Sequence, residues 1–112
     1  MYKVNITEIA ERDILDAAVY IAHNLSNVVA ANRLLDDSDI AAKSLENFPM
    51  HHPLVRDDLL AAKGLRSFPV KNYLMFYVVR EESNNVNVMR FIHSRRDWAK
   101  LFDDTMFEDT IK

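Results

Sequence analysis

The sequence predicts an α+β domain in which two antiparallel helices pack on a mostly antiparallel, twisted sheet. Three observations predict this class. The apolar run Tyr73–Val79 is too short for a membrane helix and is rich in residues that fill a pleated surface. Apolar residues recur at spacings of three and four in Ala10–Leu25 and again in Ala31–Phe48, which is typical of two amphipathic helices. Tyr2–Ile6 alternates and predicts a short strand.

The first half of the chain therefore predicts a strand followed by two helices. Thr7 is a suitable cap for the first helix, which we expect to end near Asn24. Ser26 is a suitable cap for the second helix, and its apolar stripe continues to Phe48. The short connection between the helices predicts that they are antiparallel.

The second half predicts strands and one short helix. Pro49 and Pro53 end the second helix and make the intervening loop stiff. Leu65–Val70 alternates as a strand, and Pro69 places its end at an edge or bulge. After the last strand, Asp97 is expected to cap a short helix. The predicted order is β-α-α-β-β-β with a final α, in one domain over residues 1–112.

Tyr73–Val79 and the β-rich run that begins at Val86 predict a hairpin, because Ser83-Asn84 between them suit a turn. An antiparallel register from this tip places two sets of side chains on opposite faces. One face carries Leu74, Phe76, Val78, Met89, Phe91 and His93. The other carries Tyr73, Met75, Tyr77, Val79, Val88, Arg90, Ile92 and Ser94. If the strand partners shift by two residues, each side chain stays on the same face, because side chains alternate with a period of two. We expect the helices to cover the face that carries Tyr73.

Charge and composition limit the classes of function. The chain has no cysteine, so a reducing compartment is permitted and a Cys-based zinc site is excluded. The charged N-terminal residues lack the apolar core of a signal peptide, and we expect a cytoplasmic protein without a membrane span. Net charge is −3, but residues 61–100 hold 8 basic and 3 acidic side chains, a balance of +5. This basic region suits phosphate or an acidic partner, although the overall charge argues against RNA.

Four positions are candidates for chemistry or binding. His93 is a candidate general base, as histidine side chains often are, but its expected neighbours are apolar, which also suits a packed histidine. Arg95 and Arg96 are suited to bind phosphate or an acidic partner segment, or they simply flank the expected helix cap at Asp97. Arg66 suits either a solvated face or a partner contact. His51 and His52 lack a ligand cluster, so no metal and no cofactor is expected.

Two segments of the chain form a joint pattern. They are 64–77, from Gly64-Leu65-Arg66 to Asn72-Tyr73-Leu74-Met75-Phe76-Tyr77, and 91–98, Phe91-Ile92-His93-Ser94-Arg95-Arg96-Asp97-Trp98. Together they resemble the RelE/ParE toxin superfamily of type II toxin–antitoxin systems, and the ParE-like, plasmid-stabilisation branch most. The resemblance implies a RelE-like two-layer fold and a cognate antitoxin as partner. RelE-like members cleave mRNA on the ribosome, whereas ParE members poison DNA gyrase.

The departures from the nuclease pattern favour the ParE-like branch. Leu74 stands where RelE-like nucleases carry an arginine for the scissile phosphate, and Phe102 stands where many carry a catalytic tyrosine. Arg96 aligns with an arginine that the nucleases use, and His93 lies near a histidine that some use as acid or base. These two residues are the catalytic candidates if the protein is a nuclease.

We therefore expect a toxin that acts by binding a target such as DNA gyrase, in a hetero-oligomer with its antitoxin when neutralised. The alternatives are a ribosome-dependent mRNA endonuclease and an antitoxin-bound remnant without toxicity. The expected target-binding residues are Arg66, Arg95, Arg96 and Trp98. In the RelE-like nucleases the catalytic arginine points into an open cleft, so the resemblance implies an open apolar strip there for the antitoxin. Its expected residues are Leu74, Phe76, Val78, Met89 and Phe91.

Overall fold

The computed structural model describes residues 1–108 of the chain. The elements in chain order are β1 (Lys3–Ile6), α1 (Glu8–Asn24), α2 (Val28–Ser44), the 3-10 turn η1 (Pro49–His51), α3 (Asp58–Ala62), β2 (Arg66–Val70), β3 (Tyr73–Arg80), the 3-10 turn η2 (Glu81–Ser83), β4 (Asn85–His93), the 3-10 turn η3 (Trp98–Leu101) and α4 (Thr105–Glu108). The predicted α+β class and the order β-α-α-β-β-β are confirmed. Within residues 1–108, no helix has the length and apolar character that a membrane span requires.

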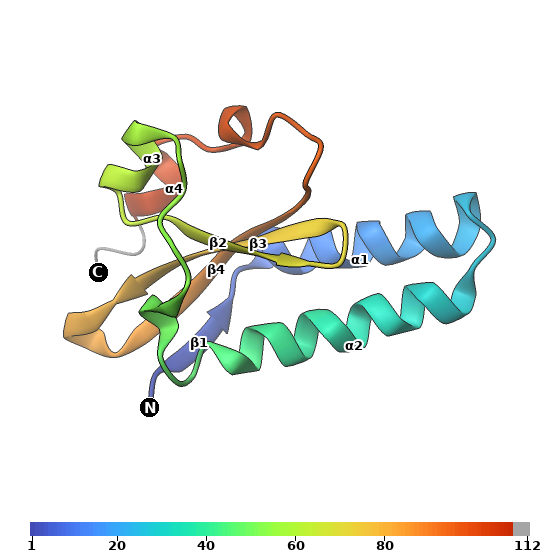
Figure 1. Cartoon of the computed structure of the whole chain (residues 1–112), viewed down its shortest axis with the longest axis horizontal. Coiled ribbons are helices and arrows are strands. Elements are labelled where there is room, and N and C mark those ends of the chain that lie inside the picture. The colour runs from blue at the N-terminus through green and yellow to red at the C-terminus, as the bar shows by residue number, and fades with distance from the viewer. Residues whose placement is uncertain (109–112) are drawn as a thin grey trace.

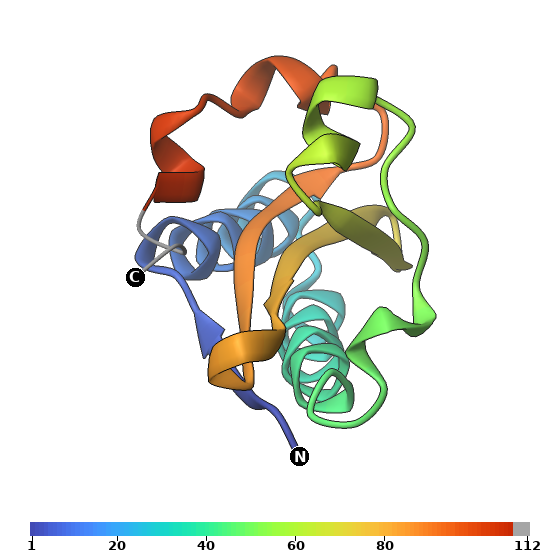
Figure 2. The same cartoon turned by 90° about the vertical axis from the view of Figure 1, so that its left-hand side faces the viewer.

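The four strands form one mixed sheet in the order β1-β4-β3-β2. β1 is parallel to β4, and the other neighbours are antiparallel. Figures 1 and 2 show α1 and α2 running side by side on one face of this sheet, while α3, η3 and α4 gather on the opposite face. The paired helices project beyond the end of the sheet, so a corner forms where the strands stop and the helices continue.

The helix boundaries follow from local capping. The Thr7 hydroxyl accepts a hydrogen bond from the Ala10 N–H at 3.2 Å, and α1 ends at Asn24 as predicted. The predicted Ser26 cap is wrong, because Ser26 lies in the turn with a φ of 50° and Asn27 caps α2 through the Ala30 N–H. The expected extension of α2 to Phe48 is also wrong, since α2 ends at Ser44.

Two short elements near the C-terminal half differ from the sequence prediction. Asp97 precedes η3 but makes no side-chain capping bond, so its predicted role as a helix cap is wrong. The helix α3 was not predicted. Two residues in the sequence mark its ends. The Asp57 carboxylate caps the start of α3 by accepting the Leu60 N–H at 3.1 Å, and Gly64 follows its end with a φ of 85° that glycine adopts readily.

A β-bulge in β4 overturns part of the predicted face assignment. Phe76 pairs with Arg90 and Tyr77 pairs with Val88, which leaves Met89 as an extra residue. The extra residue reverses the alternation for the rest of β4. Phe91 therefore lies on the helix side of the sheet, where it stacks on Tyr73 with ring centroids 5.0 Å apart, and not beside Phe76 as predicted.

Each face of the sheet has its own hydrophobic core. The core beneath α1 and α2 contains Ala10, Ile14, Ala17, Leu34, Ala42, Leu45, Val70, Met75, Tyr77, Val86, Val88 and Phe91. The core on the opposite face contains Val55, Leu60, Leu65, Phe76, Val78, Met89, Ile92, Phe102 and Phe107. The prediction that the helices cover Tyr73, Met75, Tyr77 and Val79 is thus confirmed, but the opposite face is also covered.

One ion pair ties α1 to β4 next to the bulge. The Arg90 guanidinium donates from Nε to Asp13 Oδ2 at 2.7 Å and from Nη2 to Oδ1 at 3.1 Å. The same carboxylate accepts the Phe91 N–H at 3.0 Å. Both side chains are largely buried, with 13% of Arg90 and 15% of Asp13 exposed. A paired, hydrogen-bonded charge is tolerated at this depth, whereas an unpaired one is strongly destabilising.

We therefore predict that Asp13→Ala lowers the free energy of unfolding by about 3 to 5 kcal/mol, because it leaves Arg90 buried and unpaired. Urea unfolding followed by circular dichroism measures this. The matched control is Asp16→Ala, which removes an exposed carboxylate one turn along the same helix and should change stability by less than about 0.5 kcal/mol. Equal midpoints for the two variants would contradict the assigned role of the pair.

Candidate functional site

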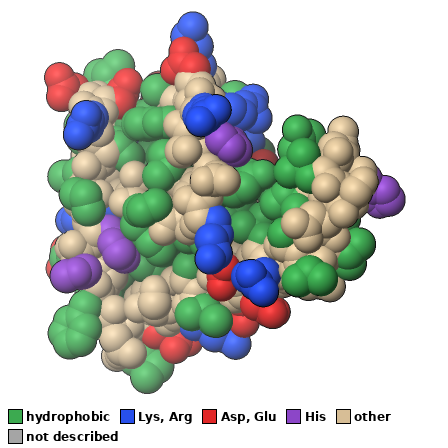
Figure 3. All heavy atoms as spheres, turned by 45° about the vertical axis from the view of Figure 1, so that its right-hand side comes forward, with side chains coloured by type: hydrophobic (Ala, Val, Ile, Leu, Met, Phe, Trp, Pro, Cys, Tyr) green, Lys and Arg blue, Asp and Glu red, His purple; other side chains and the backbone are tan. Residues whose placement is uncertain are grey.

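One concave region lies where the paired helices project past the strands, and we call it the Tyr73 corner. It consists of two hollows of about 440 and 270 Å³ that share Tyr73 as a lining residue. The larger is lined by Asp13, Asp16, Ala17, Tyr20, Tyr73, Arg90, Phe91, Ile92, His93 and Arg96. The smaller is lined by Ile21, Ala30, Arg33, Leu34, Lys71, Asn72 and Tyr73. Figure 3 shows a hollow with an apolar floor and basic side chains along its edge.

Tyr73 is at the centre of the corner because of the strand register. It begins β3 opposite His93, so its ring meets the His93 ring edge-on at 5.2 Å and stacks on Phe91. α1 supplies the facing wall with Tyr20 and Ile21. Burial raises the pKa of the Tyr73 phenol, and the nearby Tyr20 raises it further. Tyr73 therefore stays a neutral aromatic surface at physiological pH.

The structure brings two predicted site residues together in the larger hollow, namely His93 and Arg96. His93 lies on the helix side of the sheet and not in the predicted cluster with Leu74 and Phe76, because the bulge reverses its face. Its Nδ1 accepts the Arg95 N–H at 3.1 Å, which fixes the ring. Arg95 and Arg96 are exposed beside it. Tyr20, Arg33 and Asp16 belong to the same corner but were not singled out from the sequence.

The predicted open strip for the antitoxin is wrong. Leu74, Phe76, Val78 and Met89 do share one face, but the chain's own segments cover it, and Phe76 and Val78 are 0% exposed. The Trp98 ring packs on the Phe76 ring at 5.0 Å. The fifth predicted member, Phe91, lies on the other face. A Phe76→Asp substitution would therefore place a charge in the core and not on an open surface.

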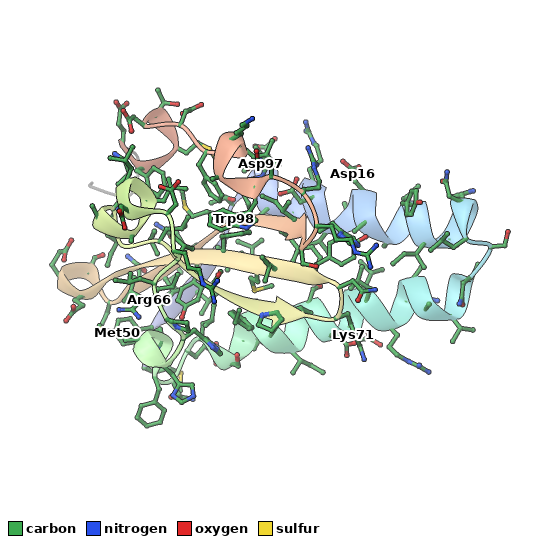
Figure 4. The ribbon with its side chains drawn as sticks, turned by 45° about the horizontal axis from the view of Figure 1, so that its top comes forward. Asp16, Met50, Arg66, Lys71, Asp97 and Trp98 are labelled. Atoms are coloured by element: carbon green, nitrogen blue, oxygen red, sulfur yellow. The ribbon has the colours of Figure 1, made fainter. Side chains whose placement is uncertain are left out.

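Trp98 thus has a packing contact, and Figure 4 shows it between η3 and the sheet. Arg66 also has a structural contact. Its Nη1 donates to the carbonyl oxygens of His52 at 2.6 Å and of Met50 at 3.3 Å. Figure 4 places Arg66 and Met50 at one end of β2 and Lys71 at the other. Since Arg66 pairs with Tyr77 and His93 pairs with Tyr73, the structure separates Arg66 from Arg95 and Arg96.

The loop that Arg66 holds is also tied to Tyr77 and Phe68. The Tyr77 hydroxyl donates to the Pro49 carbonyl oxygen, and the His52 ring stacks on Phe68 with centroids 4.1 Å apart. Burial lowers the pKa of His52, and the neighbouring His51 lowers it further. Among residues 1–108, no group of three or more His, Asp or Glu side chains is arranged to hold a metal ion. The His52 ring therefore has a packing contact, whereas His51 is exposed.

Comparison with known families assigns the chain. The family described as "ParE toxin of type II toxin-antitoxin system, parDE" matches residues 4–98. The chain belongs to the ParE toxin family. Comparison with curated proteins found no match.

Two solved structures show the same fold as this ParE-family chain. One is the chromosomal ParDE toxin–antitoxin system of P. aeruginosa, with a TM-score of 0.66, 16% identity and coverage of 83% of this chain and 96% of that one. The other is the RelBE2 toxin–antitoxin complex of Mycobacterium tuberculosis, with a TM-score of 0.58, 22% identity and coverage of 82% and 96%. At these identities the likeness concerns the fold.

The Tyr77 contact generates a prediction about pH. Burial raises the pKa of the Tyr77 phenol to about 12, with Arg66 and a backbone hydrogen bond acting in the opposite direction. The folded state thus favours the neutral phenol, so its stabilisation is complete below about pH 10 and is lost as the pH rises toward 12. We predict that the free energy of unfolding falls by about 2 to 3 kcal/mol more in the unaltered protein than in Tyr77→Phe over this range.

Denaturant titrations at several alkaline pH values measure this difference. Tyr20→Phe, which removes an exposed phenol, is the matched control and should keep the full alkaline loss. A Tyr77→Phe protein with the same alkaline loss as Tyr20→Phe would show that the Tyr77 phenol is not responsible.

Proposed function

We propose that this ParE-family protein is a toxin that acts by binding its target, with DNA gyrase as the candidate, and that a cognate antitoxin neutralises it. The family match supports the toxin class. The observation that supports action by binding, and not by RNA cleavage, is the apolar face around Leu74 and Phe102. A nuclease that moves a proton and stabilises a phosphate needs ionisable groups and cations that substrate can reach.

The face around Leu74 and Phe102 provides neither the ionisable groups nor the cations that a nuclease needs. Leu74 is a hydrocarbon side chain packed on the buried cluster with Trp98. Phe102 is only 9% exposed and packs edge-to-face on Phe76 at 5.2 Å. A phenylalanine in this position has no proton to donate, and an RNA phosphate would meet apolar side chains instead of a guanidinium. If Leu74 and Phe102 correspond to the nuclease positions as the resemblance implies, their packing on the buried cluster supports a mode of action without phosphate chemistry.

One observation favours ribosome-dependent mRNA cleavage as a second candidate. His93 and Arg96 line the same hollow, and two tyrosines accompany them. A histidine base beside an arginine has the elements for cleavage of RNA by its own 2′-hydroxyl. However, His93 Nδ1 is engaged by the Arg95 N–H, and the carboxylates of Asp13 and Asp16 lie in the same hollow, where they would repel the phosphate.

We predict that induced expression without antitoxin arrests growth while mRNA stays intact, and that purified protein inhibits supercoiling by DNA gyrase. Primer extension on cellular mRNA and a supercoiling assay measure the two results. His93→Ala should remain toxic, because a protein that acts by binding needs no base. In-frame mRNA cuts that disappear in His93→Ala would establish the nuclease instead. An absence of any growth effect, with the antitoxin still bound, would indicate a non-toxic remnant.

A further inference from the structure

We propose that the loop of residues 46–52, which we call the Phe48 loop, is a contact surface for the target protein of this toxin, and that the Phe48 ring enters an apolar pocket of that target. This inference rests on the proposed action by binding and assigns a surface to it. The loop is held by Arg66, at the end of β2 that Figure 4 shows opposite to Lys71, so it is separate from the Tyr73 corner.

The first argument is the rigid backbone of the loop. Its carbonyl oxygens accept hydrogen bonds from the residue before β1, from within the loop and from the side chains of β2 and β3. The bonds are Tyr2 N–H to Glu46 at 2.9 Å, His51 N–H to Phe48 at 3.0 Å, the Tyr77 hydroxyl to Pro49, and Arg66 Nη1 to Met50 at 3.3 Å and to His52 at 2.6 Å. A loop fixed in this way presents its exposed side chains in one geometry, which lowers the entropic cost of binding a partner.

The second argument is that Phe48 strains the fold without packing in it. Among residues 1–108, four residues other than glycine have a positive φ, and Phe48, with φ 55° and ψ 50°, is the one aromatic residue among them. A bulky side chain in this left-handed region costs free energy, and a ring that is 84% exposed regains little of it by burial. Leu59 is almost as exposed, at 79%, but it lies in α3 without a positive φ. Strain of this kind is typical of functional contact sites.

The third argument is the shape and charge of the surface around the ring. A hollow of about 400 Å³ lies beside Phe48, and its lining includes Tyr2, Pro49 and Met50. Residues 44–55 contain no lysine or arginine and one acidic residue, Glu46. A nucleic acid or an acidic peptide requires cations that this surface lacks. An exposed aromatic ring on a nearly uncharged surface instead fits an apolar pocket of a protein, because buried aromatic anchors supply much of the energy of protein interfaces.

Charge also separates a target protein from a second copy of this chain. Each copy has a net charge of −3, and a two-fold contact at the Phe48 loop would bring two Glu46 side chains toward each other. Like charges therefore oppose self-association through this loop, whereas a target without an acidic group at its pocket meets no such repulsion.

Induced expression without antitoxin tests the contact, because growth arrest reports target binding whichever protein is the target. Phe48→Ala should abolish growth arrest at a matched protein level and should raise the concentration for half-inhibition of DNA gyrase supercoiling at least about tenfold. Its antitoxin affinity should stay within about twofold by titration calorimetry. The matched control is Leu59→Ala, which truncates a similarly exposed apolar side chain and should keep growth arrest and gyrase inhibition.

A second variant separates the proposed contact from a structural role. Phe48→Gly should also abolish growth arrest, but it should raise the midpoint of thermal unfolding by about 2 to 5 °C, because glycine adopts the left-handed backbone without the steric cost. Loss of growth arrest together with a higher midpoint supports the proposal, since a residue that supported the fold would change both in the same direction. A lower midpoint in Phe48→Gly would overturn it.

The remaining outcomes distinguish the contact from the proposed function. Full growth arrest in Phe48→Ala would overturn the contact, while the proposed toxin would stand. No growth arrest by the unaltered protein would overturn the proposed toxin and the contact with it. Arrest that Phe48→Ala abolishes, without gyrase inhibition by the unaltered protein, would support the contact and exclude gyrase as the target. Weaker antitoxin binding, or loss of a dimer in sedimentation velocity, with arrest retained in Phe48→Ala, would assign the loop to the antitoxin or to a second copy and overturn the proposal.

Discussion

The Asp13–Arg90 ion pair is the contact on which the arrangement of the molecule depends. The carboxylate satisfies the Arg90 guanidinium and the Phe91 N–H, and Arg90 Nη1 also donates to the Leu101 carbonyl oxygen at 3.3 Å. One charged group thus connects α1, β4 and the C-terminal segment that covers the opposite face of the sheet. Hydrophobic cores are non-directional, so they do not by themselves choose the register of β4 against α1. A buried pair with fixed hydrogen-bond geometry excludes a one-residue slip, since a slip would leave both charges unpaired.

The bulge at Met89 is the geometric consequence that matters for function. It places Arg90 on the Phe76 face, from where Arg90 still reaches Asp13 on α1, and turns Phe91 toward the helices, where Phe91 stacks on the ring of Tyr73. A regular strand would place Arg90 and Ile92 on the helix side and Phe91 on the other. Tyr73 would then lack its stacking partner, and the two hollows would not share an aromatic floor. The Asp13–Arg90 ion pair, which stabilises the fold, is therefore coupled through the bulge to the shape of the Tyr73 corner.

The sequence carried enough local information for the order of elements but not for the contacts between distant segments. Apolar periodicity and the Thr7 cap identified α1, and the run of β-prone residues identified β3, because these signals act within a few residues. β3 is apolar on both faces, so the pattern of polar and apolar residues along it does not reveal that the partner strand carries an extra residue at Met89. The partners Asp13 and Arg90 are 77 residues apart, and no local pattern relates them. Asp57 and Gly64 did mark the unpredicted helix α3, and their spacing would have sufficed to find it.

The side chains that each face of the sheet presents explain why we expect this protein to act by binding and not by catalysis. One face has Leu74 and Phe102 at the positions where the resemblance to RelE-like nucleases implies a cation and an acid, and the apolar residues around them pack against the chain's own C-terminal segment. Closure of that face by Trp98, Phe102 and Phe107 stabilises the fold but removes a surface for RNA. The other face keeps the Tyr73 corner, where the exposed side chains of Arg33 and Arg96 line the two hollows that share Tyr73. Recognition by a surface of this kind uses shape and charge and requires no proton transfer, so it does not depend on the groups that a nuclease needs.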